Sequence, residues 1–165
     1  MVRYHIEQAV REIDASPLLS IKGYSHILTK ASKIRLSELP ILLKMWFLLG
    51  ELLILQRRTP LPKLLARFDA TPGCIANSRI HPERLAYLVT GTVRFTLRDR
   101  FCMKRSILLF HFLRRSGEDV RINFGFSREG GELLGHAWID LDGKPFAEAE
   151  DPTGRYVRMY TYPSA

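Results

Sequence analysis

The sequence predicts an α+β protein in which a mainly helical N-terminal half, residues 1–82, precedes a core at residues 83–165 where a helix packs on an antiparallel sheet. Three observations predict this class. A nearly unbroken apolar run spans residues 39–55, a helical pattern covers residues 101–115, and alternating apolar and polar residues separated by turn signals fill residues 120–149. With 165 residues, 46% of them apolar, the chain is long enough to bury such a core.

Charge and cysteine content narrow the function classes. The chain has 25 Lys and Arg residues against 17 Asp and Glu, but residues 94–115 are strongly basic whereas residues 118–151 carry nine acids against three basic residues. This compensation argues against a nucleic-acid-binding protein, whose basic residues usually form one uncompensated face. Cys74 and Cys102 are too few for a disulfide framework, and the first 20 residues show no secretory pattern, which predicts a reducing, cytoplasmic setting.

The apolar run is the first clear element. We expect a helix over about residues 38–56 with Ser37 as its N-cap, and its 17 apolar-run residues would span roughly 26 Å, slightly short of a bilayer core. Lys44 and Glu51 lie seven residues apart on a narrow polar stripe of this helix. The stripe favours burial against the rest of the chain or a partner over a membrane span, and contact with a membrane surface stays open. A short helix is expected at Leu61–Phe68.

Two further helices, over residues 83–98 and 101–115, lead to the sheet, and the second stops at Ser116-Gly117. At about 100° per residue, Cys102 and Ser106 share the face that we expect to pack on the sheet. His111 falls on the opposite face, which predicts a surface histidine. Cys102 also lies in the first turn, where backbone N–H groups and the helix dipole favour a thiolate and can bind an oxyanion.

Three strands follow the cysteine helix. We expect them at Val120–Phe126, Leu133–Leu141 and Lys144–Ala149, separated by turns at residues 127–131 and at Asp142-Gly143. In the second strand, the period of two places His136 on one face together with Trp138 and Asp140. An inward cysteine at a helix start, followed by a strand histidine, suits a Cys-His pair built from a helix packed on a sheet.

These motifs resemble the papain-like transglutaminase superfamily, and more closely its small bacterial branch that includes the leader peptidases of lasso-peptide biosynthesis. The resemblance covers about residues 38–150 and is carried by Cys102–Ser106 (CMKRS), Leu113–Gly117 (LRRSG), the strand ending in Gly125-Phe126, and above all Gly135–Gly143 (GHAWIDLDG). It implies a papain-like and transglutaminase-like core with Cys102 as nucleophile and His136 as general base and then acid. The family's third residue is typically an Asp twelve positions after the His, where this chain has Glu148.

The identity of the acid depends on the hairpin after His136, because Glu150 and Asp151 also lie close in sequence to Glu148. A three-residue loop, Leu141 to Gly143, would place Glu148 directly opposite His136 and also pair Trp138 with Phe146. A two-residue loop would place Ala149 opposite His136. The better cross-strand pairs favour the first register, and therefore Glu148 as the residue that orients the imidazole.

The resemblance implies a substrate and partners. The substrate would be the leader part of a ribosomally made precursor peptide, removed before a separate ATP-dependent enzyme closes a macrolactam ring. A separate small leader-recognition protein is expected as a partner, and neither a metal nor a cofactor is implied. Two alternatives remain open: an acyl or amide transferase that uses the same thioester chemistry, and a noncatalytic peptide-binding module in which Cys102 and His136 are structural.

Overall fold

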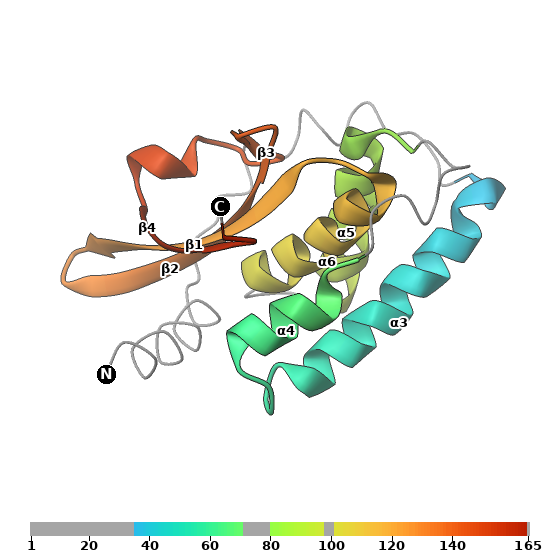
Figure 1. The fold of residues 1–165 in the computed structure, drawn as a ribbon, viewed down its shortest axis with the longest axis horizontal. Helices are drawn as coiled ribbons and strands as arrows, with labels where there is room; N and C mark the ends of the chain where they lie inside the picture. The colour runs from blue at the N-terminus through green and yellow to red at the C-terminus, as the bar shows by residue number, and fades with distance from the viewer. Residues whose placement is uncertain (1–34, 71–79, 98–100, 165) are drawn as a thin grey trace.

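The computed structural model describes residues 35–70, 80–97 and 101–164, and it is an α+β fold of four helices and a four-stranded sheet in that part of the chain (Figure 1). Cys74 lies outside the described residues. The strand order is β3-β2-β1-β4 and every neighbouring pair is antiparallel, which confirms the predicted fold class. The elements are α3 Leu39–Leu55, α4 Leu61–Phe68, α5 Pro82–Thr96, α6 Cys102–Ser116, β1 Val120–Glu129, β2 Glu132–Leu141, β3 Lys144–Phe146 and β4 Val157–Tyr162.

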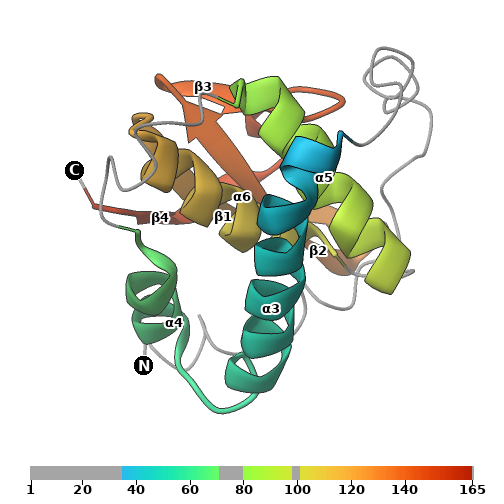
Figure 2. The same ribbon diagram turned by 90° about the vertical axis from the view of Figure 1, so that its right-hand side faces the viewer.

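Helix α6 is the centre of the fold. It lies among α3, α4, α5 and strands β1 and β2 and contacts each of them (Figure 2). Every residue from Cys102 to Leu113 is buried. The helix ends at Gly117, whose φ of 90° lets its N–H and that of Glu118 turn back to the last carbonyls. One hydrophobic cluster joins α3, α4, α5 and α6 to β1 and β2, so helices from the N-terminal half contribute directly to the core around the sheet.

Burial of α6 on all sides corrects the prediction for His111. The ring is 9% exposed, and its Nδ1 lies 2.9 Å from the carbonyl oxygen of Phe68 at the end of α4. The face of α6 that points away from the sheet is therefore covered by α4. A helix with neighbours on both sides leaves no surface position in its middle.

Helix α3 forms where the apolar run predicted it, with a different beginning. Leu36–Glu38 form a short 3₁₀ helix and Glu38, not Ser37, precedes the first helical residue. Glu38 is buried and Arg84 of α5 donates to both of its carboxylate oxygens, at 2.8 and 2.7 Å. These bonds hold the pKa of Glu38 at about 2, against the opposing effect of burial.

The faces of α3 differ in exposure. Met45, Leu49 and Leu52 are fully buried in the core. The opposite side, which we name the outer face of α3, carries five exposed apolar side chains: Leu39, Leu43, Trp46, Phe47 and Ile54. Trp46 makes an edge contact with Phe95 of α5 at 5.8 Å. None of the helices in residues 35–70, 80–97 and 101–164 is long and apolar enough to cross a bilayer.

The β2–β3 hairpin corrects the predicted register. Ile139 pairs with Phe146, and Leu141 pairs with Lys144, which is the two-residue loop. Both loop residues have positive φ, 50° at Asp142 and 75° at Gly143, as the tight turn that matches the strand twist requires. The predicted third strand also ends early, at Phe146 instead of residue 149.

Strand β4 was not anticipated from the sequence. It pairs with β1 on the side away from β2, with a bulge between Phe124 and Gly125. Tyr160 and Tyr162 of β4 pack against the main core, and Tyr162 meets Phe110 of α6 edge to face at 5.7 Å. The strand therefore completes the cover of α6 by the sheet.

Candidate active site

Cys102 is the first residue of α6, the helix that packs on strands β1 and β2. Its side chain is buried and the sulfur is hydrogen-bonded to His136. One turn later, the Ser106 hydroxyl donates to the carbonyl oxygen of Ala137 at 2.9 Å, which ties α6 to β2 next to the histidine. The predicted inward orientation of Cys102 and Ser106 is confirmed.

His136 lies on β2 and its ring contacts two aromatic rings. The ring of Trp138 is stacked on it at 6.0 Å with an interplanar angle of 13°, and the ring of Tyr156 lies at 5.0 Å. Trp138 is fully buried, and its indole N–H donates to Asp140 at 3.2 Å. With only 3% of its surface exposed, His136 has little freedom to change its orientation.

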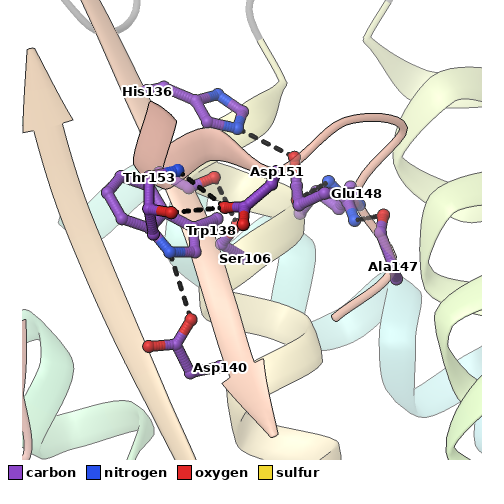
Figure 3. Close-up of polar contacts among 10 residues, drawn as sticks. Ser106, His136, Trp138, Asp140, Ala147, Glu148, Asp151 and Thr153 are labelled. Atoms are coloured by element: carbon purple, nitrogen blue, oxygen red, sulfur yellow. Dashed lines mark hydrogen bonds and ion pairs between the residues drawn. The ribbon is translucent and has the colours of Figure 1, made fainter. Parts of the chain in front are cut away.

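The carboxylate of Glu148 is the third group of the site, and it contacts the imidazole of His136. His136 Nε2 donates to Glu148 Oε2 at 2.9 Å, as the dashed line in Figure 3 shows, and this leaves Nδ1 for the sulfur of Cys102. Glu148 reaches this position although it is not paired in the sheet. The chain leaves β3 after Phe146, and Ala147, with a φ of 57°, turns the backbone so that the next side chain points to His136.

The other two acids weighed for this role point elsewhere. Asp151 accepts hydrogen bonds from the backbone N–H of Thr153 at 2.9 Å and from its hydroxyl, and it caps a short 3₁₀ helix (Figure 3). Glu150 is exposed. Of the three, only Glu148 contacts the imidazole, although the register used to choose it is wrong.

Burial and partners set the charges at this site. Burial lowers the pKa of His136, but its hydrogen bonds with Cys102 and Glu148 outweigh burial and raise that pKa to about 9. Burial raises the pKa of Glu148, and the charge of Arg105 together with the bond from His136 brings it below its ordinary value. Both shifts favour the charged forms, an imidazolium on His136 and a carboxylate on Glu148, and the imidazole ring lies beside the Cys102 sulfur.

Arg105 is the residue of the site that sequence reasoning missed. Its guanidinium is 1% exposed and donates to Glu148 Oε1 at 2.9 Å. A signal was present: Arg105 follows Cys102 by three residues, so it lies on the same inward part of a helix whose other inward residues are small or apolar. A charged side chain in that position is uncommon without a buried partner.

The arrangement is suited to nucleophilic acyl transfer. A sulfur nucleophile contacts its base, the base is oriented by a carboxylate, and the first-turn N–H groups of α6 are donors for a developing oxyanion. Within the described ranges, no cluster of three His, Cys, Asp or Glu side chains has the arrangement of metal ligands.

A family model, described as the transglutaminase-like superfamily, matches residues 45–161. The match spans more than half of the chain and includes Cys102, His136 and Glu148. No curated protein and no solved structure matches the chain.

Proposed function

Because this chain belongs to the transglutaminase-like superfamily, whose chemistry is typically that of cysteine proteases and transferases, we propose that it is a cysteine peptidase that removes the leader from a ribosomally synthesised, lasso-type precursor peptide. The contact of Cys102 with His136, and of His136 with Glu148, carries this proposal. These contacts link a nucleophile to its base and the base to an orienting acid, which is the arrangement that peptide cleavage through an acyl-enzyme needs.

In the first half of the reaction, the Cys102 sulfur attacks the carbonyl carbon of the bond between leader and core peptide. The backbone N–H groups at the start of α6 stabilise the negative charge that develops on the carbonyl oxygen. His136 then gives its proton to the leaving amine of the core peptide. The leader remains attached to Cys102 as a thioester.

In the second half, His136 takes a proton from a water molecule that attacks the thioester carbonyl. The leader leaves with a free carboxylate and the thiolate is restored. Glu148 stays ionised throughout, because its role is to orient the imidazole and to stabilise the imidazolium form. Cleavage in the cytoplasm would supply a core peptide with a free amine to the ATP-dependent enzyme that closes the macrolactam ring.

The outer face of α3 supports the inclusion of a partner. Leu43, Phe47 and Ile54 are each more than 60% exposed there, and contiguous apolar patches are uncommon on isolated domains. We assign this face to the separate leader-recognition protein rather than to the precursor itself, because it lies on α3 whereas the reacting sulfur lies at the start of α6.

The test uses a short candidate precursor peptide, sought among the neighbouring genes, with and without a candidate leader-recognition protein. Mass spectrometry should show leader and core peptide as separate products, and Cys102→Ala should abolish them while circular dichroism shows an unchanged fold. Cleavage in H₂¹⁸O should place one ¹⁸O atom in the new carboxylate of the leader. Unlabelled leader joined to an added amine would indicate a transferase, and an intact precursor together with slow iodoacetamide labelling of Cys102 would indicate a noncatalytic module.

A further inference from the structure

We propose that Arg105 is a positioning residue of this site: it holds the carboxylate of Glu148 directed at His136, and thereby orients the imidazole that activates the Cys102 sulfur. This inference rests on the proposed cysteine-nucleophile chemistry and adds a fourth residue to it. It makes no assumption about which peptide is cleaved.

The geometry around Glu148 carries the proposal. Arg105 Nη1 donates to Glu148 Oε1 at 2.9 Å, and His136 Nε2 donates to Oε2 at 2.9 Å, so the two carboxylate oxygens are divided between the two cations. Arg105 Nη2 donates to the carbonyl oxygen of Ala147, the residue immediately before Glu148. One guanidinium therefore fixes both the side chain and the backbone of the segment that delivers the acid.

Glu148 depends on Arg105 for its position, because its backbone is not held by pairing with a neighbouring strand. Strand β3 ends at Phe146, and Ala147 has left-handed φ, so neither Ala147 nor Glu148 is paired with β2. Arg105, in contrast, belongs to α6, a helix buried from Cys102 to Leu113, and lies one turn after the nucleophile. The acid is thus positioned from the nucleophile's own helix.

Charge gives a second reason. The side chain of Glu148 is 5% exposed, and burial without a cation would favour its protonated form, which does not stabilise an imidazolium. A buried arginine is itself costly unless it is paired. The pair is consistent with a requirement for a permanently charged carboxylate at this point, since an apolar pair of similar size would satisfy packing equally well.

The experiment measures Cys102 directly, without substrate. In a Cys74→Ala background, the rate of iodoacetamide alkylation of Cys102 is followed between pH 5 and pH 10 for the wild type and for Arg105→Met, Arg105→Lys, Glu148→Gln and the double variant Arg105→Met/Glu148→Gln. Arg114→Met is the matched control, because Arg114 lies on the same helix and pairs with Asp69 at 3.0 Å, away from the cysteine. Thermal denaturation of each variant reports its stability.

We expect Arg105→Met to move the pH profile of Cys102 alkylation to higher pH by about one pH unit and therefore to slow alkylation near pH 7, because the imidazolium next to the sulfur loses part of its stabilisation. Arg105→Lys, which restores the charge with fewer donors, should fall between Arg105→Met and the wild type. The double variant should be no slower than Glu148→Gln, because Arg105 acts through that carboxylate. Arg114→Met should have the wild-type profile.

Three results would overturn the proposal: a wild-type pH profile for Arg105→Met with only its melting temperature lowered, alkylation of Arg105→Lys as slow as that of Glu148→Gln, or effects of Arg105→Met and Glu148→Gln that multiply. If Arg105→Met does not fold, Arg105→Lys and the electroneutral double variant decide by the same criteria. Failure of the underlying cysteine-nucleophile chemistry is distinguishable, because Cys102 of the wild type would then react no faster than a free cysteine at neutral pH, whereas failure of the peptidase assignment alone would leave Cys102 reactive and the precursor uncleaved.

Discussion

Gly125 of β1 offers a sharp test of how the sheet supports His136. A Cβ placed on Gly125 would lie 2.8 Å from the carbonyl oxygen of Val157 and 2.9 and 3.0 Å from the ring carbons Cζ3 and Cη2 of Trp138. The backbone of Gly125 itself is compatible with any residue, so crowding alone decides the cost of a substitution. Because Trp138 is stacked on His136, a displaced indole ring would also disturb the imidazole.

The expected loss of stability follows from the short distances around the added Cβ. Contacts below 3.0 Å to a backbone oxygen and to a fully buried ring require the β1–β4 pairing or the indole to shift. Overpacking by one methyl group typically costs about 1–3 kcal/mol. For a chain of this size, about 2 kcal/mol lowers the melting temperature by roughly 4–8 °C. We therefore expect Gly125→Ala to lose stability in this range and to slow Cys102 alkylation near pH 7.

Two other glycines supply matched controls. Gly50 and Gly91 lie inside α3 and α5, and an added Cβ at either position meets no atom within 4 Å. Ala at these positions should stabilise the protein by about 0.5–1 kcal/mol, because it restricts the unfolded chain and suits a helix. Thermal denaturation followed by circular dichroism compares the three variants. A Gly125→Ala protein that melts at or above the wild-type temperature would refute the reasoning.

Three further outcomes are expected. Glu148→Gln should lower kcat on the precursor at least about tenfold, because a neutral amide does not stabilise the imidazolium, whereas exposed Glu150→Gln should stay within about twofold; steady-state kinetics compare them. The pKa of His136 is raised from 6.5 to about 9, so its contribution to stability is complete below pH 6.5 and is lost as the pH rises through 9. The melting temperature should therefore fall between pH 6.5 and pH 9, and a His136→Ala variant with the same fall would contradict this assignment. In urea unfolding, Leu49→Ala should lower the free energy of unfolding by about 2–5 kcal/mol, because Leu49 is buried in the core. Phe47→Glu, on the outer face of α3, should change it by no more than about 0.5 kcal/mol. A strongly destabilised Phe47→Glu protein would show that this face is packed against another part of the protein.

Local patterns in the sequence were sufficient to predict much of the site's framework. The period of two around His136 predicted strand β2, and the helical period predicted that Cys102 and Ser106 face the sheet. The bounds of α4 were predicted to the residue. These features depend on neighbours along the chain, which a single sequence contains.

Features that depend on contacts between residues far apart along the chain could not be predicted from the sequence. The burial of His111 arises because α4 covers its face of α6, and the role of β4 arises from its pairing with β1. The hairpin register was chosen for its cross-strand side-chain pairs, but the positive φ of both Asp142 and Gly143 favours the shorter loop. Glu148 still contacts the imidazole because the chain turns at Ala147, which no pairing rule anticipates.

The three residues of the site stand on elements of very different local stability. Helix α6 is buried along most of its length, so its amide hydrogens should exchange with solvent only through global unfolding. Strand β3 is three residues long and lies at an edge of the sheet, so the segment that follows it can open while the core remains closed. Mild heating should therefore release Glu148 while Cys102 is still in place, and the proposed peptidase activity should disappear at a lower temperature than the helical circular dichroism signal.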